Sequence, residues 1–287
     1  AQRDLQARYL AMLLAARQPA AALEWLERLR RHHPHDPLLG WFEASALDAL
    51  GRDREAAARF EALHSVLGDD PEFLNAHARH AFRVGKPELA RACAERAVQR
   101  DPHNQEGWGH LGLAWRLAGD AREGWLCDYE RLVGYIPVPP PDGTSPAAFL
   151  AALRQTLEGL HVASREPVNQ SVRNGSQTGG RLFGRADPVL RATEAALREA
   201  VDAWIAGLPD DPRHPFLSRK RRSVRFAGSW SVRLKSSGRH SNHIHNEGWM
   251  SSAFYVALPA AVAAGDASSP HAGWIQFGQP MEELGLD

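Results

Sequence analysis

Three histidines and a glutamate lie close together in the stretch HSNHIHNEGW, residues 240–249. Within it, His243 and His245 are separated by one residue. Because side chains at positions i and i+2 of an extended chain point to the same side, both imidazoles can reach a single ion. Paired imidazoles are common ligands of Fe, Mn, Zn and Ni. The spacing therefore predicts a metal site, although a chain with fourteen histidines can contain such a pair by chance.

A period of two in the apolar residues surrounds this stretch. From about residue 222, alternation bounded by Gly and Pro runs through SVRFAGSWSVRL, SSAFYVALP and GWIQFG, which predicts antiparallel strands. Earlier in the chain, residues 146–160 and 187–207 have helical periodicity. Asp187 is expected to cap the second of these helices, with a proline in its first turn. The histidine pair is thus expected between two strands.

The first half of the chain repeats with a period of 34 residues, over residues 3–138. Each unit has a helix, a short turn and a second helix. The positions that recur are Gly51, Gly85 and Gly119 in the turns, and Ala22, Ala56 and Ala90, with Gly124 next, in the second helices. Four units fit: 3–36, 37–70, 71–104 and 105–138. In the last one, Gly124 and Asp128 depart from the pattern, so its second helix is expected to be a modified junction.

The segment QEGWGHLGLAWRLAG places Trp108, Leu111, Gly112 and Trp115 where the tetratricopeptide repeat has an aromatic residue, a leucine, a glycine and an aromatic residue. The four units resemble that family. The resemblance implies an α-solenoid whose concave groove is lined by the first helix of each unit. The residues expected to face this groove are Trp41, Asn75, Arg79, Arg83 and Arg116.

An asparagine and three arginines on one surface could hold the carboxylates of a peptide through charge-assisted hydrogen bonds. A peptide or protein is therefore the expected partner of the groove. The alternative is that these arginines form a solvated helix face, and the sequence leaves both interpretations open.

Helical periodicity stops at GYIPVPPPDGTSP, which has five prolines in thirteen residues. We therefore expect a multidomain α + β protein. Residues 3–138 would form an all-α solenoid, residues 139–146 a Pro-rich linker, and residues 147–287 a β-rich domain.

Composition excludes several classes of function. Lysine plus arginine and aspartate plus glutamate each number 34, so no net basic field favours nucleic acid or an anionic membrane. No apolar run reaches the roughly 18 residues that a membrane span needs. Cys93 and Cys127 lack the spacing of a metal motif, which indicates free thiols in a reducing, cytoplasmic location.

Three blocks occur in a specific order around the histidine pair: NQSVRNGSQT (169–178), SWSVRLKSSGRHSNHIHNEGWMSSAFYVALP (229–259) and GWIQFGQP (273–280). Together they resemble the 2-oxoglutarate- and Fe(II)-dependent oxygenases found in bacteria behind tetratricopeptide arrays. The resemblance covers about residues 160–285. It implies a double-stranded β-helix, or jelly roll, with Fe(II) and 2-oxoglutarate at its open mouth, and makes His243 and His245 the first two iron ligands.

Two features depart from that family's pattern. The wider superfamily has H-x-D where this chain has H-x-H, and Glu247 is a weak substitute because a turn at residues 246–248 would aim it elsewhere. The last histidine ligand, and an arginine for the cosubstrate, are expected on a later strand. We therefore expect a fragment, incomplete at its C-terminus, whose third ligand lies beyond Asp287.

Two further residues are candidates for binding 2-oxoglutarate. Arg233 and Lys235 share a face of the strand that leads to the histidines, so either could pair with a carboxylate of the cosubstrate. A solvated strand face is the alternative.

The expected function is hydroxylation of a peptide, a protein or a small molecule, coupled to oxidation of 2-oxoglutarate to succinate. A groove that captures the substrate would raise its effective concentration at the iron. The alternative is a non-catalytic protein–protein interaction scaffold with a degenerate β-barrel. A cupin is excluded by spacing, because a single residue separates His245 from Glu247.

Overall fold

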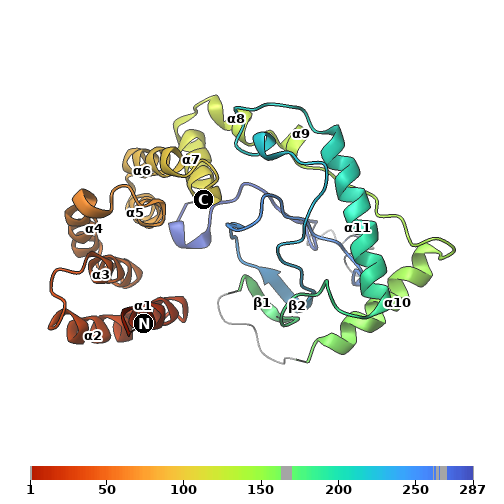
Figure 1. The fold of residues 1–287 in the computed structure, drawn as a ribbon, viewed down its shortest axis with the longest axis horizontal. Helices are drawn as coiled ribbons and strands as arrows, with labels where there is room; N and C mark the ends of the chain where they lie inside the picture. The colour runs from red at the N-terminus through yellow and green to blue at the C-terminus, as the bar shows by residue number, and fades with distance from the viewer. Residues whose placement is uncertain (1, 163–169, 261, 263–264, 266–269, 287) are drawn as a thin grey trace. The chain divides into compact units, whose positions relative to one another are not determined.

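The structure is a computed structural model that describes residues 2–162, 170–260, 262, 265 and 270–286 (Figure 1). The chain divides into two compact units. The first contains Ala1–Leu126 and Pro280–Asp287, and the second contains Cys127–Pro167 and Ser171–Gln279. The α + β fold class expected from the sequence is confirmed, whereas the domain bounds stay a prediction.

The first unit is built from successive helix pairs (Figure 1). The pairs are α1 (Gln2–Ala15) with α2 (Pro19–Arg30), α3 (Pro37–Ala49) with α4 (Asp53–Leu67), α5 (Pro71–Arg83) with α6 (Pro87–Arg100), and α7 (Gln105–Ala118) with α8 (Arg122–Leu126). In the fourth pair the second helix, α8, has only 5 residues, as expected for a modified junction.

A left-handed residue closes the turn inside each pair. The glycines that recur every 34 residues, Gly51, Gly85 and Gly119, have φ of 70°, 72° and 65°. Glycine lacks the Cβ that makes this conformation costly, so it allows an immediate reversal of the chain. Arg17 stands 34 residues before Gly51 and has a φ of 57°, so the first repeat uses the same turn without glycine.

Small residues and helix caps then hold each pair together. Ala22, Ala56 and Ala90 are fully buried at equivalent positions of the second helices. The N-caps of the first helices follow the same period: the side chains of Asp36, Asp70 and Asn104 accept hydrogen bonds from backbone N–H groups of α3, α5 and α7. Such caps satisfy donors that have no partner within the helix.

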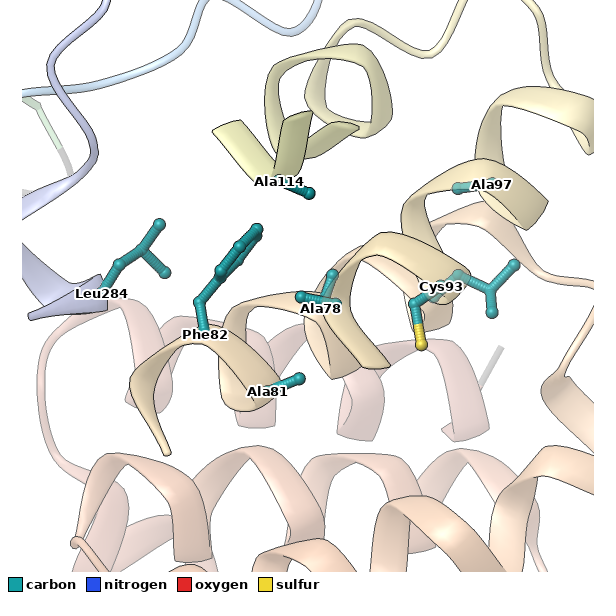
Figure 2. Close-up of a cluster of buried hydrophobic side chains, with 9 residues drawn as sticks. Ala78, Ala81, Phe82, Cys93, Ala97, Ala114 and Leu284 are labelled. Carbon is teal, nitrogen blue, oxygen red and sulfur yellow. The ribbon is translucent and has the colours of Figure 1, made fainter. Parts of the chain in front are cut away.

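The segment from Pro280 onward contributes to the core of the first unit. A 3-10 helix, η2 (Glu282–Leu284), places Leu284 in one buried cluster with Leu74, Phe82 and Ala114. Figure 2 shows Leu284 beside Phe82 in this cluster. Leu284 is 3% exposed, so these residues form an integral part of the repeat unit's packing.

The second unit contains two helices that pack together and a small sheet (Figure 1). It contains α9 (Tyr129–Leu132), α10 (Pro146–Leu160), β1 (Val172–Gln177), α11 (Pro188–Gly207), the 3-10 helix η1 (Leu217–Arg219) and β2 (Val232–His240). The two expected helices are confirmed as α10 and α11. Asp187 caps α11 by accepting from the N–H groups of Val189 and Leu190, and Pro188 is its first residue.

Strand formation differs from expectation. Antiparallel β1 and β2 make the one sheet of the described residues, with an irregular register between Arg173 and Gly175. Residues 251–259 and 273–278 were expected to be strands, and the structure contradicts this, because neither segment is hydrogen-bonded into a sheet. An alternating segment becomes a strand only where a neighbouring backbone supplies partners. The complete jelly roll stays a prediction.

The strain at Arg17 gives a test of the repeat turn. Arg17→Gly should raise the free energy of unfolding by about 0.5–1 kcal/mol, because it relieves a left-handed conformation that costs an ordinary residue about 1 kcal/mol. Chemical denaturation followed by circular dichroism would measure the change. The matched control is Gly85→Ala, which should lower stability although no atom lies within 4 Å of the added Cβ. No gain from Arg17→Gly would contradict the left-handed turn in the first repeat.

A buried histidine predicts how stability depends on pH. Burial, together with the positive charge of Arg79, lowers the pKa of His110 to about 3. The unfolded chain binds a proton at His110 near pH 6.5, whereas the folded chain binds it only near pH 3. The free energy of unfolding is therefore highest above pH 6.5 and decreases as the pH falls towards 3. This one group should reduce the free energy of unfolding by up to about 1.4 kcal/mol per pH unit within that window.

Denaturation of His110→Gln across the window would measure this contribution, and its pH dependence should be shallower by the stated slope. The control is His103→Gln, which changes an exposed histidine. If the parent and His110→Gln have parallel pH profiles, the lowered pKa is refuted.

Candidate functional site

The end of β2 positions the predicted metal pair. In the register of the sheet, His240 lies opposite Val172, which is fully buried. The backbone N–H of Ser241 donates to the carbonyl of Ser171 at 2.8 Å, and the hydroxyl of Ser171 lies 2.9 Å from Nδ1 of His240. These bonds fix the chain just before His243.

His243 and His245 then face each other. Their Nε2 atoms are 3.1 Å apart and their ring centroids are 4.8 Å apart. Nδ1 of His243 lies 2.8 Å from the carbonyl oxygen of Ser241, to which it can donate a hydrogen bond. That bond would keep the proton on Nδ1 and leave the lone pair of Nε2 directed at His245. The structure therefore brings these two predicted residues together.

The surroundings of His240 and His245 favour the neutral form of both rings. Burial lowers the pKa of His245, and positive charge on His243 or His240 would lower it further. Burial also lowers the pKa of His240, with His243 as the second cause. Trp230 stacks on His245 with ring centroids 6.1 Å apart. Neutral imidazoles are the form that binds metals.

Trp249 anchors the chain immediately after the pair. Its indole N–H donates to the carbonyl of Phe216 at 2.8 Å, and its ring stacks on Phe216 with centroids 5.0 Å apart. It also packs against a cluster around Ile205 of α11. Further along, Phe254 and Val256 pack against the buried face of α10 and α11. Residues on both sides of the pair are thus held in place.

Glu247, Arg233 and Lys235 are the other residues that the sequence predicts for this site. Glu247 is exposed, and no described Asp, Glu, His or Cys forms a group of three ligands with His243 and His245. Arg233 lies opposite Ser176 in the sheet register, and both Arg233 and Lys235 are exposed on β2. Their roles as ligand or cosubstrate contacts stay predictions.

The predicted groove residues lie on the first helices of the repeats. Trp41 of α3 is half-buried, with its ring edge-on to Phe73 at a centroid distance of 6.1 Å. Asn75 of α5 is fully buried, and its side-chain amide donates to Asn104 at 2.9 Å. Asn104 therefore accepts this bond while it caps α7.

The three arginines form ion pairs within the array. Arg79 pairs with Glu106, Arg83 with Asp48 and Asp53, and Arg116 with Glu123 at 2.8 Å. A peptide carboxylate would have to exchange with these internal partners. Peptide binding by the groove stays a prediction.

A second group of candidate ligands was missed by the sequence analysis. His64, His77 and Cys93 lie on α4, α5 and α6, and one potential ligand atom from each falls within 4.8 Å of the others. Their separations along the chain match no metal motif, because each residue comes from a different helix. Only the 34-residue repeat, which predicts that these helices pack together, could have pointed to the group.

The described helices are each too short or too polar to span a membrane. No curated protein matches the chain. Among solved structures, a thermophilic TPR protein from Thermus thermophilus is similar at 21% identity and a TM-score of 0.37, covering 42% of this chain and 67% of that one.

A family model described as "Putative 2OG-Fe(II) oxygenase" matches residues 228–285. This segment includes β2, His243 and His245, and Trp249. The chain thus combines an array of helix pairs, built on a 34-residue period, with a segment that matches the 2OG-Fe(II) oxygenase family.

Proposed function

We propose that this chain is a 2-oxoglutarate- and Fe(II)-dependent dioxygenase that hydroxylates a peptide, protein or small molecule. In this proposal His243 and His245 hold the iron through their Nε2 atoms, and a third ligand comes from elsewhere. The observation that carries the proposal is the convergence of these two nitrogens, 3.1 Å apart, inside the segment that matches the oxygenase family.

The two imidazoles suit Fe(II) as part of a facial ligand set. Such sites bind iron by three protein ligands on one face and leave other positions open. When bound, Fe(II) would supply the oxidation of 2-oxoglutarate by dioxygen that is coupled to hydroxylation of the substrate. The chain's own part is to orient the rings: the carbonyl of Ser241 accepts from Nδ1 of His243, and Trp230 stacks on His245.

The cosubstrate would bind beside the pair. Arg233 and Lys235 are the cations on β2 that we propose for a carboxylate of 2-oxoglutarate, because a cationic side chain provides a charge-assisted hydrogen bond. Both side chains are exposed, so either can reorient towards a ligand.

The helical array would recruit the substrate. Repeat arrays present extended concave surfaces to peptides, and the arginines on α5 and α7 give this surface groups that recognise carboxylates. Arg79, Arg83 and Arg116 already bind carboxylates of the array, so a peptide rich in Asp or Glu is the ligand class that matches their present partners.

A non-catalytic scaffold is the second candidate. The specific observation in its favour is that the described residues bring no third ligand to His243 and His245. In that case the array would bind its partner and the histidine pair would have no catalytic role.

Substitution of the pair separates these two candidates. His243→Ala or His245→Ala should abolish Fe(II)-dependent conversion of 2-oxoglutarate to succinate. Even the loss of an outer-shell partner costs a metal site roughly 10- to 100-fold in affinity or activity, and the loss of a ligand costs more. Succinate formation under air, with and without Fe(II), measures the effect.

The matched control is His271→Ala, which removes an exposed histidine of the same unit. Its ring lies tilted against Trp274 at a centroid distance of 4.8 Å. This variant should retain the parent's turnover. Turnover that survives in His243→Ala would refute the assignment of the iron ligands. Absence of turnover in the parent, with partner binding unchanged in His243→Ala, would favour the scaffold.

A further inference from the structure

The group formed by His64, His77 and Cys93 is separate from the oxygenase segment. It lies inside the repeat array, where α4, α5 and α6 pack together, and each helix contributes one side chain. Two nitrogens and one sulfur lie within 4.8 Å of one another. Metal bonds of about 2.0–2.3 Å to nitrogen and sulfur place ligand atoms roughly 3.5 Å apart, so shifts of about 1 Å would complete a site.

Aromatic side chains surround these atoms. Phe60 stacks on His77 with centroids 4.9 Å apart and an interplanar angle of 7°, and Phe73 meets His64 edge-on at 5.6 Å. His77 and Cys93 are 4% and 2% exposed. Cys93 and Ala97 both lie on α6, and Figure 2 shows the sulfur of Cys93 directed away from Ala97. His77 and Cys93 are therefore shielded by aromatic and aliphatic side chains, whereas His64 is partly exposed and lies near the charges of Arg96 and Glu61.

The two histidines already share a hydrogen bond. Nε2 of His64 lies 2.8 Å from Nδ1 of His77, so one ring donates a proton to the other. Burial is the main cause that lowers the pKa of His64, and it lowers that of His77 to about 4. Both rings are therefore neutral at neutral pH and can offer a lone pair. His64 is only half-buried, which gives an ion a route in from the solvent.

We propose that His64, His77 and Cys93 bind a soft monovalent metal ion, Cu(I). Thiolate and imidazole ligands suit both Cu(I) and Zn(II), but Zn(II) in structural sites takes four ligands. The described Asp, Glu, His and Cys residues offer three at this place, and the rings of Phe60 and Phe73 pack against the two imidazoles. A three-coordinate arrangement is acceptable to Cu(I).

The charge of the site also favours a monovalent ion. One thiolate with two neutral imidazoles neutralises Cu(I), whereas Zn(II) would leave a net positive charge in an apolar place. Burial is the largest cause of the pKa shifts of His64 and Cys93, lowering the first and raising the second. The positive charge of Arg96 on α6 is the second cause and lowers the pKa of both groups. Although Arg96 also binds Asp69 at 2.9 Å, it makes an additional positive charge less favourable.

Binding requires two changes of protonation. The Cys93 thiol releases its proton to solvent as the sulfur–copper bond forms, and the overall charge is conserved. The imidazole that donates in the His64–His77 hydrogen bond moves its proton to its other ring nitrogen, and the metal replaces that hydrogen bond. No change in the oxidation state of the copper is involved.

Anaerobic titration with Cu(I), in competition with a colorimetric Cu(I) chelator, tests the proposal. The protein to use is the full chain with His243→Ala and His245→Ala, so that the candidate iron pair does not contribute. We expect one Cu(I) per chain, and X-ray absorption at the copper edge should show nitrogen and sulfur ligands. Adding Cys93→Ala or His64→Gln should weaken binding by at least about 100-fold.

Controls separate loss of ligand from loss of fold. Cys127→Ser removes the other thiol and should leave Cu(I) binding unchanged, and the helical circular dichroism of His64→Gln should match that of its parent. The proposal is overturned if no Cu(I) binds, if binding survives Cys93→Ala, or if Zn(II) occupies the group in preference to Cu(I). Because the tested protein lacks the iron pair, failure here is independent of the oxygenase proposal.

Discussion

The helical array depends on a sharp reversal of the backbone after every first helix. A left-handed residue at this turn lets the second helix run back against the first, and the alanine at the recurring position of the second helix is fully buried. The caps at Asp36, Asp70 and Asn104 start the next helix at the same phase, and the buried polar side chains of α5 find partners on neighbouring helices.

The sequence predicts this array well because its signals are local and repeat. A glycine that requires a positive φ, an alanine that allows close packing and a break between helices each act within a few residues. Strands are different, since the alternation in residues 251–259 shows which side chains turn inward but not which backbone will pair with them. Phe254 and Val256 do pack inward, two residues apart, although the segment joins no sheet.

The same distinction applies to the two groups of histidines. His243 and His245 lie on one short segment, so their spacing alone predicts that they meet. His64, His77 and Cys93 meet only through the packing of three helices, and no spacing in the sequence reveals them. The physical consequence is also different. Ligands on one segment can adjust to an ion by small backbone changes, whereas ligands on packed helices must adjust mainly through their side chains.

The η2 segment changes how the folding of the repeat unit should be viewed. Leu284 shares one buried cluster with Phe82 and Ala114, which belong to helices made far earlier in the chain. During synthesis, this apolar face emerges from the ribosome well before the residues that cover it, and closing so long a loop carries an entropic cost. The repeats, although each is local in its contacts, therefore reach their final packing only after the segment that contains the histidine pair has been made.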